Sequence, residues 1–224
     1  MTTRPHIDPV RPEPATTRQV VLRTAALTFV PALLAMTGLL HPHHLTPDTA
    51  ERWVTLHLLL LPVFPLLAAS LLVLLRGLKS PWVTVARTGS YVYAIFYTSL
   101  DAIAGIAYGT LVANKDDPAT LTRAGAAIDV VGGALGLIGS VGFLLASVAT
   151  TMALASRHGG RRVAAGGTIL IIASVMWLGS HIYWPEGVIT VLGLGLGIGL
   201  LNVASSGGTP ADAGTGSPIA SSRG

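Results

Sequence analysis

Charged residues are scarce in this chain of 224 residues, and cysteine is absent. Asp, Glu, Lys and Arg together make up 11% of the sequence, whereas a soluble domain carries about 25% because its surface must be hydrated. The hydrophobic share is 51% and the mean hydropathy is +0.65. This composition excludes a soluble protein. The missing cysteine also excludes disulfides, thiolate metal sites, iron–sulfur clusters and cysteine nucleophiles.

The few charges are spaced so that long uncharged stretches lie between them. Residues 24–47, 53–75, 130–156, 163–185 and 187–211 contain no Asp, Glu, Lys or Arg, and residues 88–114 contain only Asp101. A helix needs about 20 residues to cross roughly 30 Å of hydrocarbon, and each stretch is at least that long. The sequence therefore predicts an all-α, polytopic integral membrane protein with a bundle of six transmembrane helices.

The predicted spans lie at about 20–40, 47–75, 89–112, 126–155, 163–184 and 187–204. Pro62 and Pro65 predict a kink within the second span, because proline lacks a backbone donor and clashes with the preceding turn. Residues 1–19 and 205–224 are rich in Pro or in Ser, Gly and Ala, so we expect disordered tails. A cleaved signal peptide is an alternative for the first span, but no convincing small-x-small cleavage site follows Leu34.

Basic residues gather on one side of the predicted bundle. With the N-terminus inside, eleven of them lie in inner segments and three, Arg52, Lys115 and Arg123, in outer loops. The inner residues are Arg4, Arg11, Arg18, Arg23, Arg76, Lys79, Arg87, Arg157, Arg161, Arg162 and Arg223. This asymmetry predicts a multi-pass protein of the cell membrane with both termini in the cytoplasm. It also explains why the chain is basic, because the basic residues gather on one side of the lipid bilayer. No nucleic-acid partner is therefore expected. The predominance of Arg over Lys, with abundant Ala and Gly, is typical of a high-GC bacterial chain.

Glycines in the last span recur at small-xxx-small spacing. Gly193 and Gly197 lie on one helical face, and Gly195 and Gly199 lie on the opposite face. Neighbouring helices can therefore approach this span closely from both sides, within the chain, in a homo-oligomer or with a membrane partner. The same spacing occurs at Gly105 and Gly109, and at Gly132 and Gly136.

Asp101 lies near the middle of its predicted span, where a charged side chain costs about 2.5 to 3.5 kcal/mol in lipid. Tyr97 and Tyr108 fall on the same helical face as Asp101. Two interpretations stay open. Asp101 carries a proton or contacts an ion, on a path with these tyrosines and with Glu186, or it is a neutral carboxyl bonded to Tyr97 that holds two helices together.

The fourth predicted span has a face of polar or small residues along its whole length. A path or a packing seam would explain this face, and a seam is the commoner outcome. Its members are Asp129, Gly133, Gly136, Ser140, Ser147 and Thr151.

Ligand-type side chains of three spans lie at similar depth beneath the outer surface, with Asp101 deeper. They are His57, Asp129 and His181. Above them, a short hairpin holds His41, His43 and His44. Imidazole with carboxylate is a ligand set for a divalent metal, and His57 facing His181 suits a haem, so either is a candidate cofactor. The alternatives are a solvated loop for the hairpin and neutral histidines bonded between helices for the two deeper residues.

Motifs of catalysis are absent from the sequence. It has no zinc-binding H-E-x-x-H, no nucleophile elbow and no phosphate-binding glycine loop. The leading hypothesis is a small transporter or sensor-like protein with a metal- or proton-binding site beneath the outer face. The alternatives are a membrane enzyme or electron-transfer subunit that holds haem or metal, and a structural partner subunit whose polar stripes only pack helices.

Overall fold

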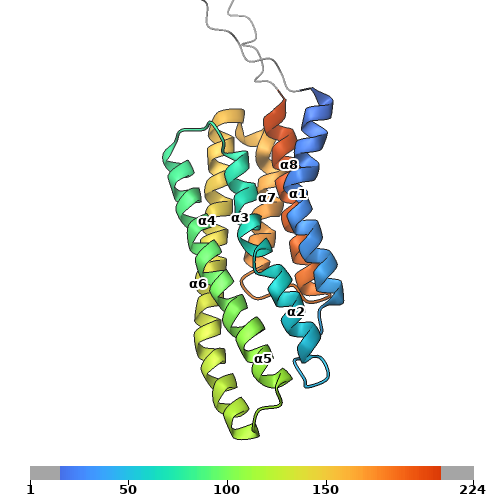
Figure 1. The fold of residues 1–224 in the computed structure, drawn as a ribbon. Helices are drawn as coiled ribbons and strands as arrows, with labels where there is room; N and C mark the ends of the chain where they lie inside the picture. Colours follow the sequence, from blue (N-terminus) through green and yellow to red (C-terminus); the bar gives the residue numbers. More distant parts are fainter. Residues whose placement is uncertain (1–15, 208–224) are drawn as a thin grey trace, which may run out of the picture.

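The computed structural model describes residues 16–207, and every regular element in this range is helical (Figure 1). The elements are α1 (Thr17–Leu40), α2 (Ala50–Leu60), α3 (Val63–Leu74), α4 (Pro81–Leu100), the π-helix η1 (Asp101–Ala107), α5 (Tyr108–Ala113), α6 (Pro118–His158), α7 (Gly160–Met176) and α8 (Glu186–Ser206). Most of the two predicted disordered tails, residues 1–15 and 208–224, lies outside the described residues.

Local signals in the sequence set where the helices begin and break. Thr16 and Gln19 form a capping box at the start of α1, with each side chain bonded to the backbone N–H of the other residue. Asp117 caps α6 by accepting from the N–H groups of Ala119 and Thr120, and Pro118 occupies the first helical position. The kink predicted at Pro62 is confirmed by the turn that separates α2 from α3.

The bundle is held together by glycines that bring helix backbones close. Gly193 and Gly197 pack against α7, whereas Gly195 and Gly199 pack against α1 on the other side of α8. The predicted two-sided approach to this helix is confirmed, and both of its glycine faces are occupied within one chain. A large cluster of buried apolar side chains from α1, α3, α4, α6, α7 and α8 fills the interior.

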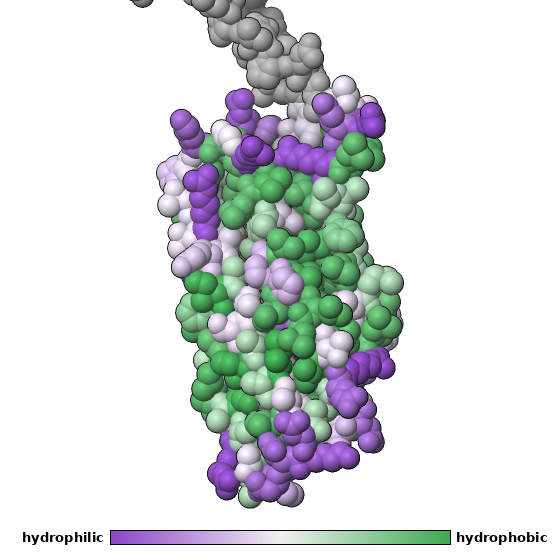
Figure 2. Space-filling model, viewed as in Figure 1, coloured by the Kyte–Doolittle hydropathy of each residue, from purple (hydrophilic) through white to green (hydrophobic). Residues whose placement is uncertain are grey.

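Five segments of the described chain are long and apolar enough to cross a membrane. They are Thr17–Leu40, Ala50–Leu74, Pro81–Ala113, Pro118–His158 and Glu186–Ser206. The sixth expected span, α7, has 17 residues and is shorter than these. Figure 2 shows the matching surface, on which a hydrophobic belt separates two hydrophilic ends. The structure thus has the features of a multi-pass membrane protein.

Three helix boundaries differ from the predicted ones by eight residues, and the others by at most three. The helix beginning at Pro81 starts eight residues before the predicted Gly89, and α6 starts eight residues before the predicted Ala126. In both cases proline opens the first turn, because its missing N–H is not needed there. In contrast, α7 ends at Met176 and not at Trp184, so His181 lies in a loop. The hairpin of α5 and α6 consequently extends beyond the lower ends of α1 and α8 (Figure 1).

Candidate functional site

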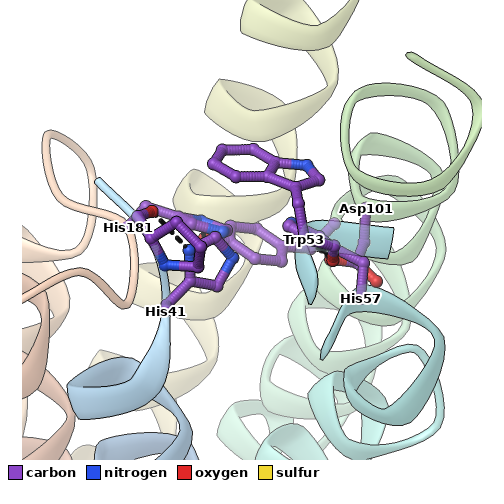
Figure 3. A network of polar contacts seen from close by, with 7 residues as sticks. His41, Trp53, His57, Asp101 and His181 are labelled. Carbon is purple, nitrogen blue, oxygen red and sulfur yellow. Dashed lines mark hydrogen bonds and ion pairs between the residues drawn. The ribbon is translucent and has the colours of Figure 1, made fainter. Parts of the chain in front are cut away.

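Three histidines and a carboxyl from distant parts of the sequence meet at the end of the bundle opposite the start of α1 (Figures 1 and 3). His41 follows α1, His57 lies in α2, Asp101 begins η1, and His181 belongs to the loop between α7 and α8. The ring centre of His41 is 4.9 Å from that of His57 and 6.3 Å from that of His181. The ring centres of His57 and His181 are also 6.3 Å apart. We call these four residues the polar layer.

The closest charged contact in the polar layer joins His57 to Asp101. The His57 Nε2 atom lies 3.7 Å from Asp101 Oδ1, and the two residues are 2% and 1% exposed. Among residues 16–207, neither carboxyl oxygen of Asp101 has a hydrogen-bond partner. A buried ionised carboxylate without partners is costly. The neighbouring imidazole is therefore the group that compensates Asp101.

A backbone contact fixes which nitrogen of His57 faces the carboxyl. The His57 Nδ1 atom lies 2.8 Å from the carbonyl oxygen of Trp53. A carbonyl only accepts, so Nδ1 carries the hydrogen and donates it. In the neutral ring, the lone pair of Nε2 then points toward Asp101. This pair can hold one proton, either on the carboxyl or as an imidazolium beside a carboxylate.

The π-helix η1 and its glycine make room for this pair. A π-helix is rare and often marks a functional position, because the extra residue per turn displaces side chains from the regular helical pattern. Asp101 is the first residue of this segment. A Cβ atom at Gly105, one turn later, would overlap the ring of His57. Glycine at this position therefore allows α2 to bring its histidine against the backbone of η1.

His181 is bound to α4 through a tyrosine. The Tyr97 hydroxyl oxygen lies 2.8 Å from His181 Nδ1, and the two rings stack with centres 6.0 Å apart. Burial, and to a smaller extent the nearby imidazoles of His57 and His41, lower the pKa of His181 to about 3. His181 is therefore a neutral ring at physiological pH.

His41 is neutral for the same reason. Burial lowers its pKa to about 4, although a hydrogen bond from its Nδ1 to the Pro42 carbonyl opposes the shift. The Nδ1–O distance is 2.8 Å, so His41 Nδ1 donates and its Nε2 carries a lone pair. Within the described part of the chain, this buried Nε2 has no hydrogen-bond partner. The layer thus combines neutral imidazoles with one carboxyl.

A cavity of about 350 Å³ lies beside the polar layer. Its walls include the rings of Trp53, Tyr97, Trp177 and Tyr183, together with His57 and His181. Asp101 lines it, and Gly132, Gly133 and Gly136 of α6 form part of its surface. The volume lies near the lower end of the range of roughly 300 to 1,000 Å³ that is usual for ligand pockets. The site can therefore accept a small molecule.

The polar layer differs from the one expected in the sequence. His57 and His181 come together as expected, and Tyr97 joins them. His41, expected in the hairpin above this layer, also packs against both histidines. Asp101 was expected to lie deeper than His57, and this is wrong, because the two side chains are 3.7 Å apart. The physical reason is the early start of its helix at Pro81, which moves Asp101 from the middle of the span toward its far end.

The other candidate residues lie away from the layer. Asp129, His43, His44 and Glu186 are exposed, and the half-buried Tyr108 contacts the Leu121 carbonyl oxygen at 3.5 Å. Asp129 lies eleven residues inside α6, because this helix begins at Pro118. Across residues 16–207, no group of three or more His, Cys, Asp or Glu side chains has a geometry that could hold a metal ion.

The haem hypothesis fits the residues poorly. Both nitrogens of His57 are directed elsewhere, Nδ1 to the Trp53 carbonyl and Nε2 toward Asp101. His181 uses its Nδ1 for Tyr97. An axial ligand must direct a free nitrogen at the iron. His57 does not offer one toward His181 in this arrangement.

Sequence reasoning missed part of the cavity wall. Trp177 and Tyr183 line the cavity, but a single aromatic residue in or beside an apolar stretch gives no signal of a site in the sequence. Trp53 also lines the cavity; it is buried, and its ring stacks on that of His57 with ring centres 5.0 Å apart. The i, i+4 spacing of Trp53 and His57 was the available signal for this contact.

No family model, curated protein or solved structure matches this chain. The function has therefore to be argued from the polar layer and its cavity.

Proposed function

We propose that this protein is a transporter of the cell membrane in which the His57–Asp101 pair binds and releases a proton during transport. The proposal includes six membrane crossings and cytoplasmic tails. The buried pair beside a cavity is the observation that carries it, because intramembrane carboxyls of this kind are expensive and are kept mainly for ion or proton pathways.

The topology is supported by helix length and by the distribution of charge. The 17 residues of α7 reach the lower limit of the about 17 to 25 residues of known spans, so α7 is the proposed sixth crossing. Basic side chains lie around the start of α1, the α3–α4 loop and the α6–α7 turn, which share one end of the bundle. By the positive-inside rule, this end faces the cytoplasm.

Proton binding at the pair gives a physical basis for coupling. With one proton between them, the imidazole and the carboxyl have a low net cost of burial. Loss of that proton leaves a bare carboxylate, which favours a conformation that hydrates it or pairs it with a cation. A proton shifts the equilibrium between two conformations only if it binds one of them more tightly than the other. The unequal cost of burying the protonated and the deprotonated pair provides such a difference in affinity.

Buried hydroxyl groups continue from the polar layer toward the proposed cytoplasmic end. The ring of Tyr93 lies 5.2 Å from that of Tyr97, one helical turn along α4, and Ser90 follows. Among the described residues, the Tyr93 and Ser90 hydroxyls have no hydrogen-bond partner. Phe143 of α6 packs on Tyr93 with ring centres 4.9 Å apart. An aromatic side chain thus packs against this row of hydroxyl groups. We expect such packing in one state of a transporter that opens to each side of the membrane in turn.

Infrared titration of the purified protein tests the proton site. A protonated carboxyl has a C=O band that vanishes on ionisation, and we expect one such band to belong to Asp101. Asp101→Asn should remove the band, whereas Asp129→Asn, which changes an exposed carboxyl on α6, should leave it. An unchanged band in Asp101→Asn would falsify the assignment of the proton to this pair.

Binding of a divalent metal is the second candidate function. His41 and His57 both donate Nδ1–H to a backbone carbonyl, as metal-bound histidines usually do. Among the described residues the Nε2 atom of His41 has no hydrogen-bond partner, and that of His57 faces Asp101. A metal would need these side chains to rotate, since the described chain contains no ready group of three ligands. Elemental analysis of wild type and of a His41→Ala, His57→Ala double variant distinguishes the two candidates. A stoichiometric metal that the double variant lacks would favour the second.

A further inference from the structure

The cavity wall has the composition of a site for a positively charged organic group. Four aromatic side chains line it, namely Trp53, Tyr97, Trp177 and Tyr183. The face of an aromatic ring carries partial negative charge and attracts a cation within about 6 Å. Indole gives the strongest attraction, and two of these four rings are indoles. Such a wall favours a soft, weakly hydrated cation over an anion.

The charges around the cavity agree with this preference. Asp101 is the carboxyl in the lining, and neither Lys nor Arg is found among the lining residues within 16–207. The His181 ring beside it is neutral, since burial lowers its pKa to about 3. Both Asp101 oxygens are buried and free of hydrogen bonds within this range. The lining of the cavity therefore combines four aromatic residues with one carboxyl, and its described residues include no lysine or arginine.

We infer that the cavity binds a small organic ammonium ion, with Asp101 as its counter-ion and the rings of Trp53, Trp177, Tyr97 and Tyr183 around it. This inference rests on the proposed function, and it names the substrate class of the same site. A hydrated metal cation is less suited, because aromatic carbon cannot replace its oxygen ligands. The volume of about 350 Å³ limits the cation to a small one.

Ammonium binding and proton binding exclude each other at Asp101. The ammonium ion needs the ionised carboxylate, so its arrival releases the proton that the His57–Asp101 pair holds. One positive charge enters the site and one leaves, and the net charge of the buried layer stays the same. The expected transport reaction is therefore an exchange of one organic cation for one proton.

Titratable groups around Asp101 come from three directions. His57 approaches from α2, Tyr93 and Tyr97 lie on the preceding turns of α4, and His181 and Tyr183 come from the α7–α8 loop. The described part of α6 lines the cavity with glycines, Leu137 and Ser140, and no titratable side chain. Burial raises the pKa of Tyr183 to about 12, so this phenol stays neutral. Proton competition at this cavity is consequently assigned to the His57–Asp101 pair.

Choline is a suitable probe, and its neutral carbon isostere 3,3-dimethylbutan-1-ol is the matched control ligand. Binding can be followed by tryptophan fluorescence and by calorimetry on the full chain in maltoside detergent. We expect choline to bind at least about 30-fold more tightly than the isostere, since a desolvated charge pair contributes that much. We also expect its affinity to fall as the pH is lowered, because protons compete for Asp101. Equal affinities for the two probes would overturn the inference.

Variants locate the binding to this cavity. Asp101→Asn should weaken choline binding about 30-fold or more, whereas Asp129→Asn should not change it. Trp177→Leu should weaken binding about fivefold by removing one ring face, and Trp184→Leu, at an indole that is 50% exposed, is its matched control. If Asp101→Asn fails to fold, the Trp177→Leu and Trp184→Leu pair still decides the question. Choline binding that none of these variants alters would place it elsewhere and overturn the inference.

Two further experiments identify the source of the cation and test the role of the proton. Short-chain phosphatidylcholine that displaces choline at equal or lower concentration identifies a lipid headgroup as the ligand, whereas no displacement identifies a free solute. In proteoliposomes, external choline should raise the internal pH of vesicles that contain wild type but not Asp101→Asn. An Asp101 infrared band without choline binding would overturn only the ligand class. Absence of both the Asp101 infrared band and choline binding would overturn the proposed function as well.

Discussion

The polar face of α6 has two halves that look alike in sequence and behave differently in the structure. Toward the proposed cytoplasmic end, the buried Ser147 hydroxyl lies 2.8 Å from that of Ser174, which also contacts the Leu170 carbonyl at 2.7 Å. Thr151 donates to the Ser147 carbonyl at 2.9 Å and packs against Gly167 of α7. Both hydroxyls of this half of the face, those of Ser147 and Thr151, have a partner, so this half is a packing seam.

The other half of the same face lines the cavity. Gly133, Gly136 and Ser140 form part of its surface. A Cβ atom at Gly133 would meet no neighbour within 4 Å among the described residues. Across the cavity stands Asp101, a buried carboxyl without a hydrogen bond in that range. Small residues thus allow close packing in the seam half and leave open space in the cavity half. The cavity half also differs in facing a buried carboxyl that has no hydrogen bond among the described residues.

The largest expected difference is in the response to pH, because the cavity half of the face lies beside the histidines of the polar layer, whereas the seam half carries no titratable side chain. The pKa of His41 is lowered from 6.5 to about 4 and that of His181 to about 3. The unfolded chain therefore takes up protons first as the pH falls below about 6.5, and each histidine removes up to about 1.4 kcal/mol of stability per pH unit down to the folded pKa. Stability should be full above pH 6.5 and fall steadily toward pH 4.

Thermal melts in detergent at a series of pH values measure this slope. His41→Gln should reduce it by up to about 1.4 kcal/mol per pH unit, because this histidine no longer titrates. His43→Gln, exposed in the same loop, is the matched control. A melting temperature that stays level between pH 6.5 and pH 4.5 would show that these rings are not held neutral by the fold.

Glycine substitutions should give the next largest difference. A Cβ atom at Gly142 would lie 2.9 Å from the Gly89 carbonyl oxygen and 3.0 Å from the Tyr93 nitrogen, so Gly142→Ala must separate α6 from α4. We expect a loss of about 1 to 3 kcal/mol. Gly133→Ala has free space and should gain about 0.5 to 1 kcal/mol, because alanine loses less backbone entropy in a helix. Similar melting temperatures for both variants would contradict the distinction between a glycine that allows close packing and one that borders open space.

The sequence predicted the helical class, the kink at Pro62 and the two-sided glycine packing of α8, because these depend on local composition and periodicity. It also placed His57 and His181 in one layer, with His41 in a hairpin above them. Charge-free stretches mark the apolar core of each span but not its ends. The starts at Pro81 and Pro118 were therefore missed, and Asp101 and Asp129 were placed at wrong depths.

The contacts of the polar layer lay beyond sequence reasoning for a different reason. The His57–Asp101 contact depends on a π-helical turn and on which face of α2 meets η1, and both are set by packing between elements far apart in the chain. The spacing of Gly105 and Gly109 correctly indicated a close helix approach. It could not show that a histidine and a tryptophan of α2 would occupy that space.

The smallest expected difference is in the sign of the stability change that a single substitution causes in the seam half and at the cavity. Ser147→Ala removes one hydroxyl of a bonded pair, and Ser174 keeps its bond to the Leu170 carbonyl, so the loss should be about 0.6 kcal/mol. Asp101→Asn removes a charge that lacks a full partner and leaves an amide that can donate to His57 Nε2. We expect it to stabilise the protein by about 1 kcal/mol while it abolishes proton binding. Opposite shifts in melting temperature would therefore mark Ser147 as part of the seam and Asp101 as a residue kept at a cost to stability. Equal losses in both variants would mean that Asp101, too, only holds helices together.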